Sequence, residues 1–277
     1  MNSITESADP SVGAENGTKV LHWPINCKDA WDNGTRVRAA ANMLCEGGKA
    51  IVTPTKVGYI VMTIDQEGLA KKFDMKQRPL RKPGVVLAVD DEHAAMLAVM
   101  DERIRELYRR AYGTRDAQDR GILLGCILPW KNDSMVPEDM RPYVMDDRHT
   151  SCFVIRYGTP SEAIAHMMWK EKGKLCFASS ANPSGKGNRG VLEGVGERIL
   201  SMTDLIIEGD AFVASQQPEA TVENRWEQGA MVSFVDEEGK LNYDLPRIIR
   251  RGIQLDEVRH LLTDIFGDYI DAHGDYH

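Results

Sequence analysis

Short apolar runs recur along most of the chain, and they limit its possible folds more than any other feature of the sequence. Examples are residues 84–89, 122–128 and 151–156. Runs that are apolar throughout, without alternation, are typical of strands covered on both faces of a sheet. Some connections between the runs are too short for a crossover helix, so the sheet has to mix parallel and antiparallel strands. The sequence therefore predicts an α/β fold, with a twisted mixed sheet flanked by helices.

Segments with helical spacing separate several of these runs. We expect a helix at residues 35–46, because its apolar spacing stops at a Gly-Gly pair. A short basic helix is expected at 69–75. One long amphipathic helix is expected through residues 94–107, where apolar residues recur on one face.

The region from residue 35 to residue 252 contains no long linker and no internal repeat, which favours a single domain there. Residues 1–34 are polar and are expected to form a flexible leader. Residues 253–277 are expected to form a C-terminal helix and an acidic tail.

The overall charge and the cysteine pattern argue against several classes of protein. The 277 residues include 34 Lys and Arg against 42 Asp and Glu, a net charge of −8. Proteins that coat nucleic acids need a basic surface instead. No run of about 18 apolar residues is present to span a membrane, and no secretory signal is expected. Five cysteines without a Cys-x-x-Cys spacing and seven histidines without metal-ligand spacing predict a cytoplasmic protein with reduced thiols and no metal site in the chain.

The segment from Ser179 to Gly185 reads Ser-Ser-Ala-Asn-Pro-Ser-Gly and follows an apolar run at 174–178. A strand that ends in hydroxyl and amide side chains before glycines is a common way to hold phosphates or a sugar. Its candidate ligand-binding residues are Ser180, Asn182 and Ser184. An ordinary Ser/Asn/Gly turn is the alternative interpretation.

A basic cluster lies between residues 71 and 82, where six Lys and Arg residues accompany one acid, Asp74. Such a cluster within an acidic protein suits a compact anion better than a long polyanion. Lys76 and Arg78 are expected to lie in an extended segment, in which alternate residues point the same way and reach one polyphosphate together. The alternative is a solvated helix face.

Three further strand ends carry polar side chains. Thr55 follows the run 49–53, Arg156 closes the run 151–156, and Arg250 ends a run at 245–250. Each of these side chains can reach a ligand at the edge of a sheet. Surface ion pairs are the alternative for the two arginines.

Taken in order, these motifs resemble those of the YrdC-like domain family, whose best-known members are threonylcarbamoyl-AMP synthases. The resemblance covers residues 35–252. The two most specific motifs are Lys-x-Arg-Pro and Ser-Ala-Asn-x-Ser-Gly. The matching residues are Gly47-Gly48, Pro54-Thr55, Lys76, Arg78, Pro79, Lys82-Pro83, Arg156, Ser180 to Gly185, Arg250 and Gly252.

The resemblance implies a single α/β domain around a basic cavity, and a nucleotidyltransferase reaction. In that reaction L-threonine, bicarbonate and ATP give threonylcarbamoyl-AMP and pyrophosphate, usually with Mg²⁺, as a step in tRNA modification. It also implies the site. Lys76 and Arg78 would be the catalytic pair that binds the phosphates. The other residues would bind nucleotide or substrate; these are Thr55, Tyr59, Arg156, Ser180, Asn182, Ser184 and Arg250.

The chain departs from the family at one wall of the expected site. The family has Glu-Thr-x-Tyr-Gly-Leu after its Pro-Thr, whereas this chain has Lys56-Val57-Gly58-Tyr59-Ile60-Val61. The family's Trp-Pro-Gly-Pro-Leu-Thr segment is absent. These changes favour nucleotide binding over threonine as the retained property. The alternative function is a non-catalytic paralogue that binds a nucleotide or RNA, double-stranded RNA included. The amine substrate, the acceptor of the product and the oligomeric state stay open.

Overall fold

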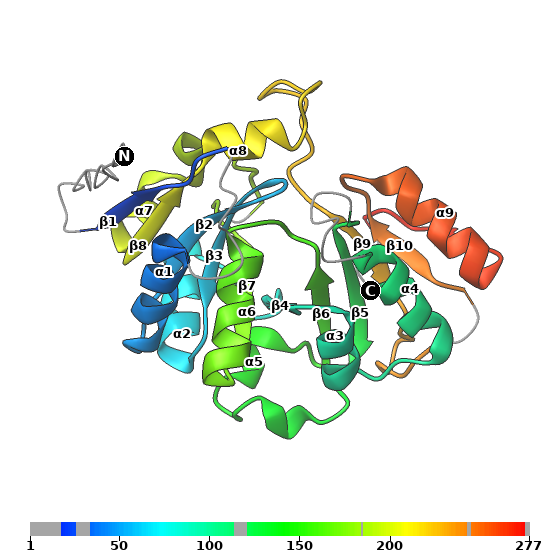
Figure 1. The fold of residues 1–277 in the computed structure, drawn as a ribbon. Helices are drawn as coiled ribbons and strands as arrows, with labels where there is room; N and C mark the ends of the chain where they lie inside the picture. The colour runs from blue at the N-terminus through cyan, green and yellow to red at the C-terminus, as the bar shows by residue number, and fades with distance from the viewer. Residues whose placement is uncertain (1–17, 26–33, 114–120, 184, 243–244, 275–277) are drawn as a thin grey trace, which may run out of the picture.

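The protein's structure, a computed structural model, describes residues 18–25, 34–113, 121–183, 185–242 and 245–274. Within these residues eleven strands form one sheet in the order β1-β8-β2-β3-β7-β4-β6-β5-β9-β10-β11 (Figure 1). The strands are β1 (Lys19–His22), β2 (Ile51–Thr55), β3 (Gly58–Thr63), β4 (Val85–Leu87), β5 (Leu124–Pro129), β6 (Thr150–Ile155), β7 (Cys176–Ser180), β8 (Leu205–Glu208), β9 (Ala230–Ser233), β10 (Arg247–Arg250) and β11 (Ile270–Asp271).

The sheet mixes parallel and antiparallel neighbours, which confirms the predicted fold class. β3 pairs antiparallel with both β2 and β7, and β4 continues the sheet antiparallel to β7. By contrast, β4 and β6 are parallel, as are β5 and β9. The central strands are buried on both faces, in agreement with their unbroken apolar sequences.

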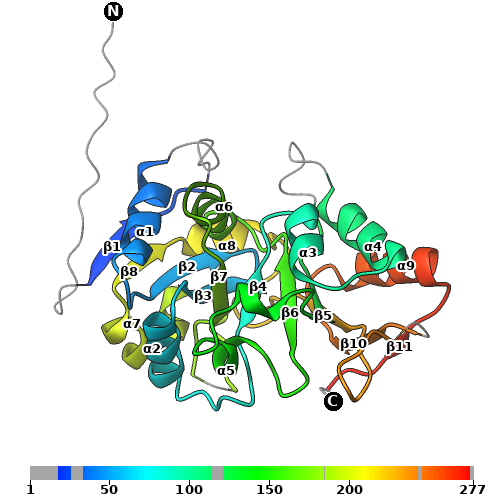
Figure 2. The ribbon, with the colours of Figure 1, turned by 90° about the horizontal axis from the view of Figure 1, so that it is seen from below.

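Helices cover both faces of the sheet. The α-helices are α1 (Thr35–Cys45), α2 (Gln66–Lys76), α3 (Asp91–Leu97), α4 (Glu102–Tyr112), α5 (Arg141–Val144), α6 (Ser161–Lys172), α7 (Glu197–Met202), α8 (Asp210–Ser215) and α9 (Leu255–Phe266), and short 3₁₀ turns lie at η2 (Asp133–Met135) and η3 (Leu192–Val195). Figure 2 shows α1 and α6 on one side of β2, β3 and β7, and α2 and α7 on the other. α4 and α9 pack together beside the opposite end of the sheet. Within the described ranges, every helix is too short or too polar to cross a lipid bilayer.

Part of the segment expected to be a flexible leader is an edge strand of the sheet. β1 pairs in parallel with β8, and the Thr18 hydroxyl donates to the carbonyl of Thr203 at 3.2 Å. Trp23 follows β1 and is buried. The apolar residues Val20 and Leu21 favour a strand in this short stretch. The prediction missed it because residues 1–34 taken together are polar. The rest of the expected leader, 1–17 and 26–33, lies outside the described residues.

The helix expected through residues 94–107 is divided into α3 and α4. The carboxylate of Asp101 accepts a hydrogen bond from the backbone of Ile104 at 2.8 Å and begins α4. The connecting residue Ala98 is extended. An N-cap aspartate provides a partner for the free amide groups of a helix start, so it favours a new helix over a continuous one.

The C-terminal region forms the expected helix, but a short strand follows this helix where only an acidic tail was expected. α9 covers residues 255–266, and after it β11 pairs in parallel with β10. Arg251 and Arg259 both form ion pairs with Asp271, at 3.0 and 2.9 Å. These contacts hold residues 270–271 against the domain.

Candidate functional site

The turn after β7 is built around the backbone of Ser180 and Ala181. The Ser180 carbonyl accepts a hydrogen bond from the backbone of Asn182 at 3.1 Å, and the Ala181 amide donates to the carbonyl of Tyr59 at 2.7 Å. The Asn182 side chain is buried and donates to the Pro183 carbonyl at 2.9 Å. Ser180 itself is exposed, so its hydroxyl is open to a ligand.

Asn188 locks this turn to the start of β3, although the sequence motifs did not single it out. Its side-chain amide donates to the carbonyls of Tyr59 (2.9 Å) and Ala181 (3.3 Å), and its side-chain oxygen accepts from Gly190 at 3.0 Å. It is 4% exposed. Gly58 leaves the room for it, because a Cβ there would lie 2.3 Å from the Asn188 side-chain oxygen. An asparagine in a glycine-rich stretch after a strand was the only available signal.

Lys76 and Arg78 come together at the end of α2, but through a different local conformation from the extended one expected. Lys76 is the last residue of the helix, and Gln77 ends it in the left-handed region at φ 49°. The helix is also longer than predicted, because Asp65 caps its start by accepting from Gly68 at 2.7 Å. The reversal at Gln77 brings Arg78 back beside Lys76, where its charge helps to lower the pKa of Lys76.

Lys76 is 2% exposed, and its amine donates to the carbonyl of Ser180. Burial, followed by the positive charge of Arg78, lowers the pKa of Lys76 to about 7. Arg78 donates from Nε to the Lys82 carbonyl at 2.6 Å and from Nη2 to the Pro83 carbonyl at 2.9 Å. These bonds fix the guanidinium plane while Nη1 makes no hydrogen bond to a described residue.

Arg250 adds a third cation to this group from the far half of the sheet. Its Nε donates to the carbonyl of Gly229 at 3.1 Å. After burial, the charge of Arg250 is the next cause that lowers the pKa of Arg78. Among the described residues, no carboxylate pairs with Lys76 or Arg78. The structure thus brings together Lys76, Arg78, Ser180 and Arg250, in a group that we name the basic site.

Two of the other expected binding residues are held in contacts within the protein. The Thr55 hydroxyl donates to the Gly58 carbonyl at 2.8 Å and closes the β2–β3 turn. Tyr59 is buried and donates to Asp210 at 2.5 Å, while its oxygen accepts from Gly209 at 2.8 Å. Burial and the neighbouring Asp210 carboxylate raise the pKa of Tyr59. A direct contact of either side chain with a ligand stays a prediction.

Arg156 belongs to a separate group from the basic site. Its backbone is left-handed at φ 57°, and its buried side chain lies 3.7 Å from the Glu162 carboxylate. The guanidinium lies 5.3 Å from the centre of the Tyr112 ring. The residue is well placed to fix the end of β6 against α6, and Gly121 makes room for it. Ser184 lies outside the described residues.

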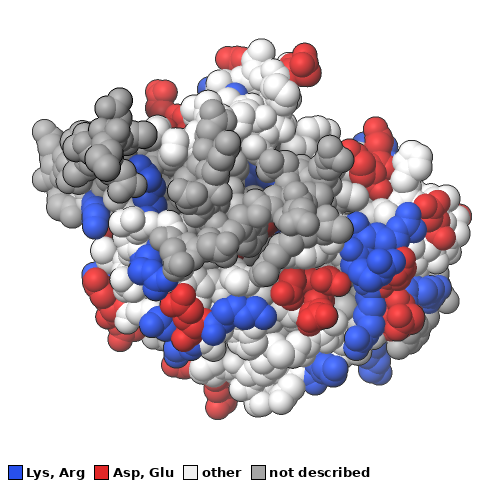
Figure 3. Space-filling view, in the orientation of Figure 1, with Lys and Arg blue, Asp and Glu red and all other residues white. Residues whose placement is uncertain are grey.

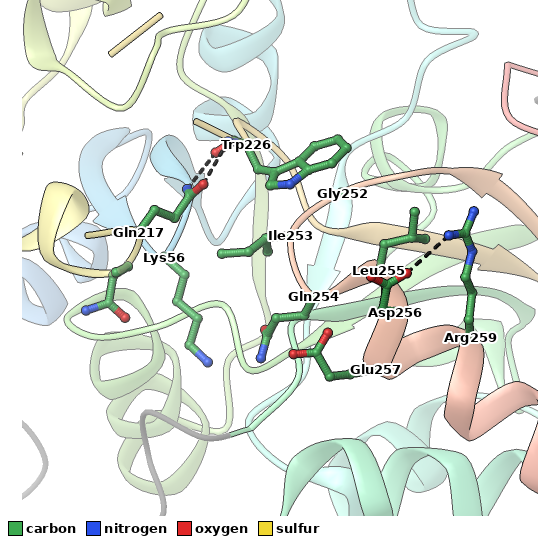
Figure 4. A pocket seen from close by; sticks show the side chains of 11 residues that line it. Lys56, Gln217, Trp226, Gly252, Ile253, Gln254, Leu255, Asp256, Glu257 and Arg259 are labelled. Carbon is green, nitrogen blue, oxygen red and sulfur yellow. Dashed lines mark hydrogen bonds and ion pairs between the residues drawn. The ribbon is translucent and has the colours of Figure 1, made fainter. Parts of the chain in front are cut away.

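A cavity of about 580 Å³ opens beside this second group (Figure 4). Lys56 lines one side and donates from its amine to the Gly121 carbonyl at 2.7 Å. Gln254 lies next to it and accepts from the backbone of Leu123 at 3.0 Å. Trp226 stands above, 45% exposed, with its backbone tied to the Gln217 side chain at 2.7 and 2.8 Å. Most of the residues that line the cavity are polar. One of them, Lys56, stands where the YrdC-like family has a glutamate.

Charge on the face turned to the viewer in Figure 3 is mixed, not of one sign. The densest group of arginines covers α4 and α9, and acids accompany it. Arg109 pairs with Glu106 at 2.6 Å, and Arg110 pairs with Asp264 at 2.9 Å. Exposed pairs of this kind are ordinary surface features. The arginines of α4 and α9 therefore do not form a surface of one sign.

Comparisons with solved structures show what this arrangement is similar to. A hypothetical protein, smu.1377c from Streptococcus mutans UA159, is 40% identical, with a TM-score of 0.81, over 94% of this chain and 99% of that chain. Sua5 from P. abyssi, complexed with L-threonine, is 20% identical with a TM-score of 0.61, over 91% of this chain and 62% of that one. E. coli YciO is 15% identical with a TM-score of 0.59, over 85% and 96%. Sua5 and YciO are YrdC-like proteins.

The chain has a YrdC-like fold. It belongs to one family with the streptococcal protein, and it shares its fold with Sua5 and YciO. A scan against protein-family profiles and a search of curated proteins gave no match. The YrdC-like resemblance that the motifs indicated is confirmed at the level of fold. In this fold the Lys-x-Arg-Pro and Ser-Ala-Asn motifs lie next to each other.

Proposed function

We propose that this YrdC-like domain is a nucleotidyltransferase that uses ATP and bicarbonate to convert an amine into a carbamoyl-adenylate, with release of pyrophosphate. L-Threonine is the first candidate for the amine. The observation that carries the proposal is the basic site, in which Lys76, Arg78 and Arg250 meet beside the exposed Ser180. Within the part of the chain that the structure describes, no carboxylate pairs with Lys76 or Arg78. Sua5, which shares the fold, has been solved with L-threonine bound.

The physical role of the basic site follows from its charges. A triphosphate carries several negative charges. Lys76 and Arg78 gain from such a ligand because neither has to break an ion pair with a described residue to bind it. Arg78 is held in one orientation by two carbonyls, so little side-chain freedom is lost when its remaining nitrogen binds a phosphate oxygen. Catalysis would come from positioning and from the neutralisation of charge that develops on the leaving pyrophosphate.

Lys76 has a second role in this proposal. With its pKa near 7, its amine is readily protonated as the phosphates arrive. The protonated amine keeps one N–H on the Ser180 carbonyl and offers others to the ligand. The end of β7 and the end of α2 would thus be held at a fixed distance around the same phosphate group.

The expected Mg²⁺ finds no ligand set in the described part of the chain. No group of three or more His, Cys, Asp or Glu side chains there is arranged to hold a metal ion. Magnesium commonly binds through substrate phosphates and water with few protein ligands, so we propose that it would enter with ATP. No step of the reaction is assigned to it.

The altered wall at Lys56 favours a second candidate, a paralogue that binds a nucleotide or an RNA end without catalysis. The family has a carboxylate at this position, whereas here a buried amine donates to the Gly121 carbonyl. A substrate amine that relied on that carboxylate would lose its partner. In this candidate function, the basic site still binds a nucleotide or an RNA end, but no reaction takes place there.

The two candidates differ in pyrophosphate release. The purified chain would be incubated with ATP, Mg²⁺, bicarbonate and a panel of amino acids, with Arg78→Ala as the matched inactive control. Release that depends on bicarbonate and on one amine supports the enzyme. Release at background with every amine, combined with wild-type ATP binding, would refute it in favour of the binding protein. A salt titration of tRNA and duplex RNA binding then tests the RNA role, since phosphate contacts give a steep salt dependence.

A further inference from the structure

The α2 helix carries a lysine that neither the sequence motifs nor the basic site accounts for. Lys72 lies one helical turn before Lys76, so both side chains leave the same face of α2. Its relative exposure is 0%, and its amine has no hydrogen-bond partner among the residues that the structure describes. Buried polar groups nearly always have a partner, and an ammonium without one is among the least favourable groups in a protein interior.

The surroundings of the Lys72 amine contain cations, carbonyls and an aromatic ring. The charges that act on it are those of Arg78 and Lys76, and both are positive. The amine lies 5.8 Å from the centre of the Phe73 ring. Gly84, at the start of β4, is packed against it, because a Cβ there would lie 2.8 Å from Lys72 Nζ and 3.1 Å from the Ala178 carbonyl of β7. From α5, the Tyr143 carbonyl accepts from the Gly84 amide at 2.8 Å.

We propose that Lys72 is a concealed cation of the basic site, neutral while the site is empty and protonated when a polyphosphate binds beside Lys76 and Arg78. The proton comes from the solvent, and the charge of the anion stabilises the ammonium that forms beside Lys76 and Arg78. Burial and the two neighbouring cations lower the pKa of Lys72 well below its ordinary value, in agreement with this behaviour. The inference rests on the proposed function only in placing a polyphosphate in the basic site.

The role of Lys72 is that of a positioning residue that adjusts charge. Without a polyphosphate, a neutral amine avoids the repulsion of three adjacent cations and leaves the fold intact. With it, the added positive charge favours ligands of high negative charge, such as a triphosphate, over those with a single phosphate. The site would therefore discriminate among nucleotides by charge.

The experiment is isothermal titration of inorganic triphosphate into the wild-type chain, Lys72→Met and Lys72→Leu, at one fixed pH slightly above neutrality. Two buffers with different heats of ionisation report the protons taken up on binding. Arg81→Met is the matched control, because Arg81 is exposed and lies near the site in the sequence. We expect the Lys72 variants to take up about one proton fewer than the wild type and to bind triphosphate roughly tenfold more weakly, with Arg81→Met close to wild type.

Urea unfolding without ligand supplies a second readout that separates this role from an ordinary structural one. Replacing an unpartnered buried amine by Met should leave the chain at least as stable, whereas removal of a bonded structural lysine would destabilise it. Wild-type proton uptake and affinity in Lys72→Met, or its destabilisation without ligand, would overturn the inference. Triphosphate binding without pyrophosphate release from ATP would overturn the proposed function alone. Absence of any triphosphate binding by the wild type would overturn the basic site.

Discussion

The amine of Lys76 donates to the backbone carbonyl of Ser180, and this bond joins the end of α2 to the end of β7. The two most specific sequence motifs, separated by about a hundred residues, therefore meet at one hydrogen bond. The carbonyl is shared with the Asn182 amide of the turn. A substitution in either motif should therefore alter the position of residues in the other motif.

Arg78→Ala is expected to weaken ATP binding by ~1.5–3 kcal/mol, the usual range for a lost hydrogen bond to a charged group. Its fixed guanidinium has no carboxylate partner among the described residues to release. Lys76→Ala should have an effect of the same order. Titration of ATP into each variant measures the loss, with Arg81→Ala as a nearby exposed control. Wild-type affinity in both variants would show that the nucleotide binds elsewhere.

The stability of the chain should depend on pH through Lys76. Its pKa is about 7 in the folded chain and near 10.5 when unfolded, so between these values the unfolded state holds more protons. The free energy of unfolding should then rise with pH, with a contribution of up to roughly 1.4 kcal/mol per pH unit from this group. Urea unfolding between pH 7 and 8.5 checks it, and Lys76→Met should lower the slope. An unchanged slope in the variant would contradict the burial of a neutral amine.

Ligand affinity should show the opposite trend with pH. A protonated Lys76 binds anions better, so affinity for sulfate, whose own charge stays constant near neutrality, should fall as the pH rises through about 7. Lys76→Arg keeps its charge throughout this window and should flatten the profile. Parallel profiles in the wild type and Lys76→Arg would assign the titration to another group.

Asn188→Asp should destabilise the chain by ~1–3 kcal/mol, because the carboxylate cannot donate to the carbonyls of Tyr59 and Ala181. It should also weaken ATP binding, since it loosens the turn that presents Ser180. Asn132→Asp is the matched control: that exposed side chain acts through its oxygen alone, which accepts from Ser134 at 3.0 Å. Equal stability of the two variants would remove Asn188 from the framework of the site.

Gly84→Ala should destabilise the chain by ~1–3 kcal/mol through overpacking. The added Cβ would meet both Lys72 Nζ at 2.8 Å and the Ala178 carbonyl at 3.1 Å. In a Lys72→Ala background the first clash is gone, and the loss should be smaller. A double-mutant cycle by urea unfolding measures the coupling, and strict additivity would mean that the two groups do not touch.

The sequence allowed the central sheet and the motif pair to be predicted, since both depend on local patterns. Fully apolar strands identify a sheet covered on both faces, and a strand that ends in Ser-Ala-Asn identifies a turn at its edge. Lys76 and Arg78 were expected to act together, and they do lie together. Their conformation was not predictable from periodicity, because a left-handed Gln77 decides it.

Other parts depend on contacts between distant segments, which a pattern along the chain does not show. β1 is a strand because β8 offers it an edge. The partners of the Tyr59 hydroxyl, Asp210 and Gly209, lie far away in the sequence, and its contact with a ligand stays a prediction. Asn188 acts on residues far away in the sequence. The division of α3 from α4 did have a local signal, the N-cap residue Asp101. The prediction followed the continuous apolar spacing instead.

The first and last strands of the described chain occupy the two edges of the sheet. During synthesis, β1 emerges from the ribosome long before its partner β8, so the N-terminal edge can close only when most of the polypeptide has been made. Both edge strands are also short, four residues and two, which leaves few open amide groups for a neighbouring molecule to extend the sheet. In the finished domain, the two short edges thus give little opportunity for aggregation through the sheet.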